Sequence, residues 1–352
     1  MSNPTLSSID LSSLDGKVVL ITGGTGSLGK TITQMILSHA NVKKLIIFSR
    51  DELKQFEMQQ QFKELDTKQV LRYFIGNVRD KDRLMMALKK VDLVLHAAAL
   101  KQVPAAEYNP FEFVKTNILG AQNIIECSIE REVKKVIALS TDKAANPINL
   151  YGATKFCSDK LFIAANQYSG SHPTRFAAVR YGNVVGSRGS VIPIFLRNRS
   201  TGVLTVTHES MTRFWITLEQ ATNFVLNCLV MMDGREIFIP KIPSMKIKDL
   251  AEFIGPNCQL ETMGIRPGEK MHEVMVPEEV GRSTIDMKDF YIIKPSDDYY
   301  KAPSYWSEGN LCQEGFEYNS GDNDIWLDEQ GMLDAISTID SDDARKFLEE
   351  IS

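Results

Sequence analysis

The sequence predicts an α/β fold built around a doubly wound parallel sheet, and two observations lead to this prediction. Short apolar runs, each bounded by turn-forming residues, alternate with helix-forming stretches through the first half of the chain. Such runs suit strands buried on both faces, and their alternation with helices is typical of parallel βαβ units. In addition, a glycine-rich loop at residues 22–29 separates the first strand from the first helix. We therefore expect a Rossmann-like sheet with a smaller C-terminal region beside it.

The expected elements follow one another at regular intervals. Buried strands are predicted at residues 17–21, 44–48, 70–75, 91–96, 135–140 and 175–180. Helices between them are predicted at residues 31–39, 53–65, 80–89, 110–131 and 154–168. After residue 182 the alternation weakens. Apolar residues at helical spacing predict an amphipathic helix over 217–232, and 236–240 is predicted to be one more strand.

The length of 352 residues suggests more than one domain. We expect a dinucleotide-binding domain over residues 1–185, which residues 212–243 rejoin. Residues 186–211 and 244–352 are expected to form a smaller substrate-binding region and the C-terminal tail.

The charge balance argues against several classes of partner. The chain has 40 basic and 45 acidic side chains, which give a formal net charge of −5. No positive excess is therefore available to bind a polyanion. We expect no nucleic-acid partner and no membrane partner, although a local basic pocket for one small phosphorylated ligand stays open.

Cysteine spacing and the absence of targeting signals predict the compartment. The five cysteines are widely spaced and form no Cys-x-x-Cys pair, as is typical of reduced thiols. The N-terminus lacks the basic start and apolar run of a signal peptide, and no apolar window approaches the roughly 18 residues of a spanning helix. His272 and Glu273 lack the two-histidine spacing of a zinc site. We expect a cytoplasmic chain and no metal.

The glycine-rich loop predicts a dinucleotide site. Gly23 permits a tight turn, Gly26 permits backbone N–H groups to approach a pyrophosphate, and Gly29 permits the helix to pack close to the sheet. The N-terminus of the helix adds a partial positive charge for the phosphates. Cofactor contacts are therefore expected from Gly23, Thr25, Gly26, Ser27, Leu28 and Gly29.

The ends of the next two strands suggest which dinucleotide binds. Ser49 and Arg50 end the second strand and suit a 2′-phosphate, because a guanidinium is a good phosphate partner. Asp51 follows, and a carboxylate near this position could instead accept hydrogen bonds from the ribose of NAD. We expect NADP, with NAD as the less favoured alternative. Asn77 and Val78, after the third strand, lie where an adenine would bind.

The stretch after the fifth strand contains groups suited to proton transfer. Tyr151 and Lys155 are four residues apart, so on a helix their side chains lie on one face. An ammonium beside a phenol favours the phenolate, and Tyr151 could then remove a hydroxyl proton while a hydride leaves. Thr141, Asp142 and Lys143 lie just before this pair. A solvated ion pair at the strand end is the alternative interpretation of the last two.

These motifs together resemble the extended short-chain dehydrogenase/reductase family. More narrowly, they are similar to the configuration-inverting UDP-N-acetylglucosamine 4,6-dehydratases over most of the chain. The motifs are Thr141-Asp-Lys-Ala-Ala-Asn-Pro147, Tyr151-Gly-Ala-Thr-Lys155, Arg180-Tyr-Gly-Asn-Val-Val-Gly186 and Arg266-Pro-Gly-Glu-Lys-Met-His-Glu273. Retaining relatives carry Glu in place of Lys143 or Met in place of Tyr151, so this sequence matches the inverting group.

The resemblance implies a role for each catalytic residue. Tyr151 would be the base for oxidation at carbon 4 of the sugar, with Lys155 lowering its pKa and Thr141 hydrogen-bonding the ketone. Lys143 would remove the proton of carbon 5 and Asp142 would protonate the departing 6-hydroxyl. Because only a neutral amine is a base, we expect the pKa of Lys143 to be lowered by burial or by nearby cations such as Lys155. Hydride return to carbon 6 and protonation of carbon 5 on the opposite face would complete the inversion.

The resemblance also implies binding residues and partners. Further cofactor contacts are expected at Ala97, Ala98 and Ala99, together with Tyr151 and Lys155. Substrate contacts are expected at Lys101, Asn183, Arg188, Arg266 and Glu269, although each could be a surface polar residue instead. The implied substrate is a UDP-sugar of the pathway to pseudaminic acid. The implied assembly is a homo-oligomer, with a hexamer as one candidate.

Two other functions stay open at this point. A UDP-sugar epimerase or ketoreductase of the same family would need Tyr151 and Lys155, but not the Asp142-Lys143 pair. A non-catalytic dinucleotide sensor would use the fold for regulated binding alone, and such proteins commonly lose the tyrosine or the lysine that this chain retains.

Overall fold

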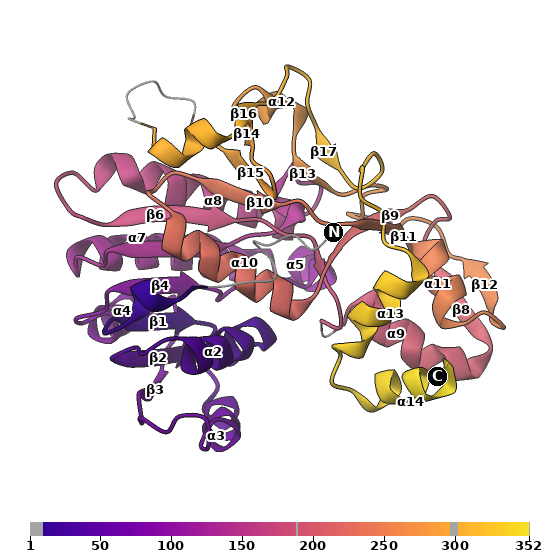
Figure 1. The fold of residues 1–352 in the computed structure, drawn as a ribbon, viewed down its shortest axis with the longest axis horizontal. Helices are drawn as coiled ribbons and strands as arrows, with labels where there is room; N and C mark the ends of the chain where they lie inside the picture. Colours follow the sequence, from indigo (N-terminus) through magenta and orange to yellow (C-terminus); the bar gives the residue numbers. More distant parts are fainter. Residues whose placement is uncertain (1–9, 188, 296–301, 352) are drawn as a thin grey trace.

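A large, mostly parallel sheet forms the centre of the computed structural model, which describes residues 10–187, 189–295 and 302–351 (Figure 1). The parallel strands are β1 (Val18–Thr22), β2 (Lys44–Ser49), β3 (Leu71–Ile75), β4 (Leu93–His96), β5 (Lys135–Leu139), β6 (Arg175–Val179) and β10 (Ile237–Pro240). They lie in the order β3-β2-β1-β4-β5-β6-β10. Helices cover both faces, which explains why the central strands are mostly apolar and buried, while the edge strand β3 is only partly buried. The predicted fold class is confirmed.

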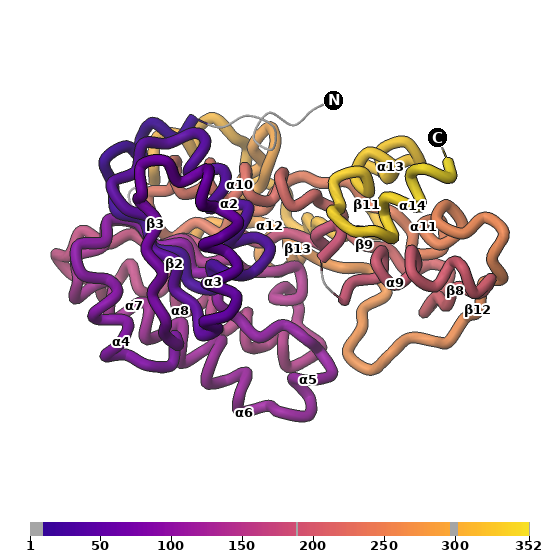
Figure 2. Tube along the Cα trace, turned by 90° about the horizontal axis from the view of Figure 1, so that it is seen from below, coloured from indigo at the N-terminus to yellow at the C-terminus, as the bar shows by residue number. Residues whose placement is uncertain are grey.

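Two layers of helices cover the sheet. On one face α2 (Ser27–His39) packs beside α10 (Leu218–Met231), and on the other α4 (Lys81–Ala87), α7 (Gly120–Glu130) and α8 (Leu150–Tyr168) pack together (Figures 1 and 2). Helix α3 (Glu52–Gln61) follows β2. Helix α8 begins earlier than predicted because Asn149 caps it, with Oδ1 accepting from the N–H of Gly152 at 2.8 Å.

The helix predicted over residues 110–131 is observed over Pro110–Glu130, but it contains a π-helical turn that was not predicted. Helix α5 (Val103–Tyr108) is followed by α6 (Pro110–Phe113), then by a π-helical turn, η2 (Val114–Leu119), and only then by α7. The turn directs Asn117 inward, where Nδ2 donates to the carbonyl of Leu100 at 2.9 Å and to Oγ1 of Thr154 at 3.0 Å. π-Helical turns are frequent at functional sites, and this one joins the segment after β4 to helix α8.

Antiparallel strands extend the sheet beyond β10. They are β15 (Phe290–Ile293), β14 (Thr284–Asp286) and β16 (Asn310–Leu311). These strands come from the range 244–352, which the sequence assigned to the second region. The division of the chain into two domains therefore stays a prediction. Nearby, β13 (Val274–Val276) pairs with β17 (Tyr318–Asn319), and α12 (Glu278–Gly281) leads into β14.

A smaller lobe with its own hydrophobic core lies beside the sheet (Figure 2). Its elements are α9 (Val191–Asn198), β8 (Val203–Val206), α11 (Ile247–Ile254), β12 (Gln259–Thr262), α13 (Glu329–Ser337) and α14 (Asp342–Ile351). A three-stranded sheet of β7 (Asn183–Val184), β9 (Thr212–Ile216) and β11 (Ser244–Lys246) lies between the two cores. Short turns of 3-10 helix occur at Ser12–Leu14, Asp142–Ala144 (η3), Arg199–Thr201 and Ser304–Glu308. Within the described ranges, no helix has both the length and the apolar composition to cross a membrane.

A buried carboxyl group links the large sheet to the segment that follows residue 302. Glu236 is fully buried, and its Oε1 accepts from the N–H of Asp233 and from Oη of Tyr305, each at 2.8 Å. Its Oε2 accepts from the N–H of Gly234 at 2.8 Å. Burial raises the pKa of Glu236 from 4.5 to about 7, against the opposing effect of these hydrogen bonds.

Replacing Glu236 with Gln is expected to change how stability depends on pH. Between about pH 4.5 and about pH 7 the folded protein holds a proton on Glu236 that the unfolded chain releases. The contribution of Glu236 to the free energy of unfolding is therefore fully present below about pH 4.5. It falls by roughly 3 kcal/mol as the pH rises to about 7. Denaturant unfolding of the wild type and Glu236→Gln across this range measures the difference, and parallel curves would contradict it.

Candidate active site

The glycine-rich loop lies where the strand order reverses between β1 and β4. Gly23 has a φ of +66°, and a Cβ there would lie 2.9 Å from the backbone N and Cα of Ala98. A Cβ at Gly29 would lie 2.5 Å from the carbonyl oxygen of Gly24, so Gly29 packs the helix against the loop rather than directly against the sheet. Gly26 is the N-cap of α2. Open α/β sheets bind ligands in the crevice at such a reversal.

Hydrogen bonds connect the loop to the segment after β4. The N–H of Ala98 donates to Oγ1 of Thr22 at 3.2 Å, and this hydroxyl contacts Nδ1 of His96 at 2.8 Å. Burial, assisted by the charge of Lys155, lowers the pKa of His96 to about 3, so the imidazole is neutral. Of the other predicted cofactor residues here, Thr25 is buried, Leu28 and Ala97 are half-buried, and Ser27 and Ala99 are exposed.

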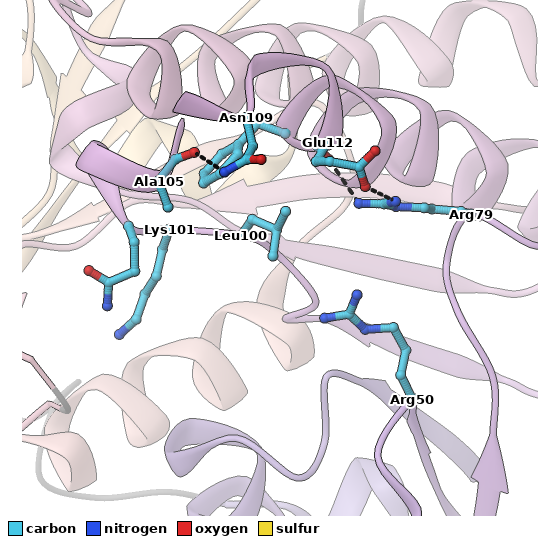
Figure 3. Close-up of a pocket in the computed structure, with 9 residues that line it drawn as sticks. Arg50, Arg79, Leu100, Lys101, Ala105, Asn109 and Glu112 are labelled. Carbon is cyan, nitrogen blue, oxygen red and sulfur yellow. Dashed lines mark hydrogen bonds and ion pairs between the residues drawn. The ribbon is translucent and has the colours of Figure 1, made fainter. Parts of the chain in front are cut away.

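The end of β2 presents Arg50 and turns Asp51 away. Ser49 is buried and accepts at Oγ from Nε2 of Gln55 at 3.1 Å. Asp51 caps α3, accepting from the N–H of Lys54 at 3.0 Å, and it also pairs with the ammonium of that lysine at 2.8 Å. Arg50 is exposed and lines a cavity of about 300 Å³ (Figure 3). Arg50 therefore lines this cavity, while the carboxylate of Asp51 is engaged by its own helix.

The same cavity brings together residues that the sequence assigned to different ligands. Lys101, predicted to contact substrate, lines it together with Arg50 and Arg79 (Figure 3). Arg79 is held by an ion pair with Glu112. The cavity thus has basic residues from the ends of three strands. Lys101, a predicted substrate residue, shares it with Arg50, a predicted cofactor residue.

The two residues predicted near an adenine take different positions. Asn77 accepts at Oδ1 from the N–H of Arg79 at 3.1 Å, which shapes the turn after β3. Val78 is buried, and a Cβ at Gly120 would lie 2.8 Å from its Cγ2. Val78 therefore packs against helix α7.

Three consecutive residues after β5 form a compact polar turn. Oγ1 of Thr141 donates to Oδ1 of Asp142 at 2.8 Å. The N–H of Lys143 donates to the same oxygen at 2.9 Å, and Nζ of Lys143 lies 3.2 Å from it. Asp142 is buried, and no described group hydrogen-bonds its Oδ2. Asp142 is therefore buried and Lys143 is half-buried, and the two are bonded within the turn rather than forming a solvated cap.

Tyr151 lies beside this turn and is influenced by Lys143. Burial raises the pKa of Tyr151 to about 12, while the charge of Lys143 and a hydrogen bond with Thr141 oppose the shift. Lys155 was predicted to supply the opposing cation. Its Nζ instead donates to the carbonyl of Leu139 at 2.7 Å, and burial lowers its own pKa. The structure assigns the cation effect on Tyr151 to Lys143.

The prediction that the pKa of Lys143 is lowered was wrong. Burial does lower it, but the carboxylates of Asp142 and Glu273 raise it further and place it above the usual range. The Nζ atom lies 3.2 Å from Asp142 and 3.3 Å from Glu273. Sequence reasoning quoted Glu273 only as the last residue of a motif and gave it no role.

The start of α8 packs directly on the turn that contains Lys143. A Cβ at Gly152 would overlap the carbonyl oxygen of Lys143, so only glycine fits between the two backbones. Nδ2 of Asn149 donates to the carbonyl of Gly268 at 2.8 Å, and Nζ of Lys270 donates to the carbonyl of Ala145. Sequence reasoning missed these positions, although the glycine beside Tyr151 was a visible signal.

The predicted substrate residues are more scattered than the catalytic ones. Arg266 and Glu269 pair with each other at 3.7 Å, and the Arg266 side chain is 60% exposed. Asn183 is half-buried on β7, and no described group hydrogen-bonds its Oδ1. Arg188 lies outside the described residues. Across the described chain, no cluster of His, Cys, Asp or Glu is arranged to hold a metal ion.

The fold and the Tyr151–Lys155 site define a short-chain dehydrogenase/reductase of the extended type. Within that class, the chain belongs to the polysaccharide biosynthesis protein family, whose model matches residues 19–295. The predicted family resemblance is confirmed.

Named relatives cover nearly the whole chain. The UDP-N-acetylglucosamine 4,6-dehydratase (inverting) of Campylobacter jejuni is 52% identical, over 91% of this chain and 97% of its own. A UDP-glucose 4-epimerase of Rickettsia conorii is 36% identical, over 92% of this chain and 96% of its own. The X-ray structure of Pen from Bacillus thuringiensis superposes with a TM-score of 0.82 at 37% identity, covering 92% of this chain and 98% of that one.

Replacing Gly152 with Ala is expected to destabilise the protein even though Ala favours helices. Ala gains about 1 kcal/mol in a helix, but overlap with a backbone carbonyl that cannot rotate away costs about 1–3 kcal/mol or more. We therefore expect a net loss of up to roughly 2 kcal/mol in denaturant unfolding. The exposed Ala164 of the same helix provides the control, because Ala164→Gly measures the intrinsic preference alone. If Gly152→Ala raised the free energy of unfolding by as much as Ala164→Gly lowers it, the result would contradict the overlap.

Proposed function

We propose that this chain is a UDP-N-acetylglucosamine 4,6-dehydratase that inverts carbon 5, and that its product is a UDP-2-acetamido-2,6-dideoxy-4-hexulose. The observation that carries the proposal is the buried turn in which Asp142 and Lys143 lie beside Tyr151. An acid and a second base next to the tyrosine are what elimination of water requires. The 52% identical relative with this name supports the same conclusion.

A nicotinamide dinucleotide is the cofactor of this reaction. When bound, it would supply a hydride acceptor for carbon 4 and a hydride donor for carbon 6, so no net oxidant would be consumed. The residues present fit such a group, because Gly26 is the N-cap of α2 and the one described atom that a Cβ there would approach is the carbonyl oxygen of Gly23 at 3.2 Å, which leaves the loop open to a pyrophosphate on that side. Within the proposal the dinucleotide is NADP, supported by the exposed Arg50 at the cavity and by the engagement of Asp51 with α3.

Oxidation at carbon 4 depends on Tyr151 and its neighbours. A phenol with a pKa near 12 keeps its proton at neutral pH, so the site must stabilise the phenolate for Tyr151 to act as a base. The ammonium of Lys143 and the hydroxyl of Thr141 both act in that direction. Thr141 is also placed to hydrogen-bond the ketone that forms.

Elimination of water depends on the Asp142-Lys143 pair. Lys143 acts as the base for the proton of carbon 5, and Asp142 protonates the departing 6-hydroxyl. Before substrate binds, Lys143 is a charged ammonium held by two carboxylates. In the loaded site the ammonium of Lys143 gives a proton to the carboxylate of Asp142, which leaves a neutral amine as the base and a carboxylic acid to protonate the departing hydroxyl.

The remaining parts of the proposal concern binding and assembly. Arg266 and Glu269 hold the uridine nucleotide, with Asn183, Lys101 and Arg188 as further contacts. The turn that contains the first two also docks through Lys270 on Ala145, close to the catalytic residues.

The enzyme acts in the cytoplasm in the pathway to pseudaminic acid, which suits its five free cysteines. It forms a homo-oligomer, with a hexamer as one candidate. Exposed apolar side chains on adjoining helices support self-association, namely Tyr108, Phe111, Leu119 and Phe156.

A UDP-sugar 4-epimerase is the second candidate, favoured by the 36% identical relative of that name. Such an enzyme needs the tyrosine and the bound dinucleotide, but it has no use for an acid and a base beside carbon 5. The Asp142-Lys143 pair beside Tyr151 therefore favours dehydration. A non-catalytic sensor is disfavoured because Tyr151 and Lys155 are both present in the site.

Incubation of the purified protein with UDP-N-acetylglucosamine in deuterium oxide, without added cofactor, tests the function. We expect a 4-keto, 6-deoxy sugar with deuterium at an inverted carbon 5 in a proton NMR time course. The Lys143→Ala variant is expected to lose at least about a hundredfold in rate while still binding NADP. A 4-epimer without a keto sugar would establish the epimerase instead, and unchanged turnover by Lys143→Ala would contradict the assigned base.

Replacing Arg50 with Ala is expected to weaken binding of NADP but not of NAD. Loss of a charge-assisted hydrogen bond to the 2′-phosphate costs about tenfold to a hundredfold in the NADP dissociation constant. Titration of the cofactor-stripped protein with each dinucleotide measures this. Arg72→Ala, which removes the same charge from neighbouring β3, is the control and should change neither constant. Equal weakening of NAD and NADP by Arg50→Ala would contradict a 2′-phosphate contact.

A further inference from the structure

Four charged side chains of alternating sign lie in a row through the site. Nε of Arg213 is 3.6 Å from Oε1 of Glu273, which is 3.3 Å from Nζ of Lys143, which in turn is 3.2 Å from Oδ1 of Asp142. The side chains of Arg213, Glu273 and Asp142 are at most 9% exposed, while that of Lys143 is 27% exposed. Glu273 is therefore the buried link between an arginine of the small sheet and the proposed catalytic base.

The backbone of Glu273 is anchored independently of its carboxylate. Its N–H donates to Oγ of Ser320 at 2.9 Å, and its carbonyl accepts from the N–H of Ser320 at 2.8 Å. Oγ of Ser320 also contacts Oγ1 of Thr212 at 2.7 Å. These contacts place the start of β13 without using the side chain. The carboxylate can therefore be changed while the backbone around it keeps its own hydrogen bonds.

The carboxylate of Glu273 has a spare acceptor in a buried setting. Its Oε2 has no hydrogen-bonding partner among the described residues, and the same is true of Oδ2 of Asp142. A buried carboxylate with an unsatisfied oxygen is costly unless another interaction compensates. The ammonium of Lys143 between the two carboxylates supplies that compensation.

We propose that Glu273 is a positioning residue for the elimination step: its carboxylate holds Nζ of Lys143 beside Asp142 and Tyr151, and Arg213 holds the carboxylate. This inference rests on the function proposed above. A lysine side chain has many rotamers, and Asp142 alone, on the adjacent residue, would leave much of that freedom. A second carboxylate from a different element fixes Nζ at one place, and a base must be placed within hydrogen-bonding reach of the proton that it removes.

The charge of Glu273 also controls when Lys143 can act as a base. The charged or titratable groups around Lys143 come from every element that packs against it, and they are Asp142 on η3, Tyr151 on α8, Arg213 on β9, and Lys270 and Glu273 in the segment before β13. Asp142 and Glu273 raise the pKa of Lys143, whereas burial and Arg213 lower it. Removing the charge of Glu273 therefore lowers the pKa of Lys143, and the amine loses its proton at lower pH.

The test compares the holoenzyme with its Glu273→Gln and Glu273→Asp variants. For Glu273→Gln we expect the maximal kcat to fall roughly tenfold or more, because the base is no longer held in place. The KM for UDP-N-acetylglucosamine should change much less. The rising limb of kcat against pH should move to lower pH by about one unit in Glu273→Gln. Glu273→Asp keeps the charge, so its kcat and its pH profile should both be closer to those of the wild type.

A spectroscopic readout separates elimination from oxidation. If elimination alone is slowed, reduced nicotinamide should accumulate during turnover by Glu273→Gln, seen as near-ultraviolet absorbance. Glu317→Gln is the matched control, because Glu317 is an exposed carboxylate next to β17, the partner strand of β13. It should show neither the accumulation nor the pH shift. A stable Glu273→Gln enzyme with the wild-type pH profile and no accumulation would overturn the proposal.

A measurement without turnover separates this inference from the proposed function. Peptide mass spectrometry can follow acylation of Lys143 by a small reagent in the absence of substrate. We expect Glu273→Gln to be labelled roughly tenfold faster, since the neutral fraction of the amine rises tenfold for each unit of lowered pKa. Unchanged labelling would overturn the positioning role. Faster labelling in a protein whose wild type makes no 6-deoxy sugar would support the positioning of Lys143 and overturn the dehydratase function.

Discussion

The close packing of helix α8 on the turn after β5 is the constraint on which the site depends. Gly152 leaves no side chain between the helix and the carbonyl of Lys143, so the two backbones can touch. Tyr151 is the residue before that glycine, and its phenol is thereby placed next to the charge of Lys143. A larger residue would separate the tyrosine from the acid and base that it must work beside. Catalytic geometry of this kind depends on groups held by rigid elements.

The second consequence of that packing is a buried arrangement of charge. Tyr151 is a neutral phenol with a pKa of about 12, and Lys143 is an ammonium between two carboxylates. The substrate-free site therefore holds protons on both of the proposed bases. Each buried charge has a partner of opposite sign, which offsets part of the cost of removing it from water. It becomes reactive only when the phenol and the ammonium are deprotonated within the loaded site.

The sheet and the placement of Tyr151 and Lys155 on one helix could be predicted because their signals are local. Strands buried on both faces are apolar along their whole length, and a tyrosine and a lysine four residues apart on a helix must share a face. The π-helical turn at Asn117 was missed because the sequence over 110–131 has ordinary helical composition. Its cause is tertiary, since Asn117 reaches the backbone of Leu100 and the hydroxyl of Thr154.

The electrostatic predictions failed for a similar reason. Lys143 and Glu273 are far apart in the sequence, and nothing between them indicates that their side chains meet at 3.3 Å. Without that contact, burial and nearby cations lower the pKa of Lys143. With it, the carboxylates of Asp142 and Glu273 raise the pKa instead. The role given to Lys155 was likewise inferred from its spacing and from the family resemblance, whereas its Nζ is engaged by the carbonyl of Leu139. Spacing predicts a shared face but not which partner a flexible cation selects.

The segment that ends at Glu273 connects substrate recognition to catalysis. The same stretch contains Arg266 and Glu269, docks on the catalytic turn through Lys270, and then places a carboxylate against Lys143. In an epimerase of this fold, the tyrosine and the bound dinucleotide suffice, so a nucleotide-binding turn need only hold its ligand. A dehydratase also needs an acid and a base whose positions are set together. A segment that touches both the proposed nucleotide site and the proposed base meets that need, because displacing one end of it disturbs the other.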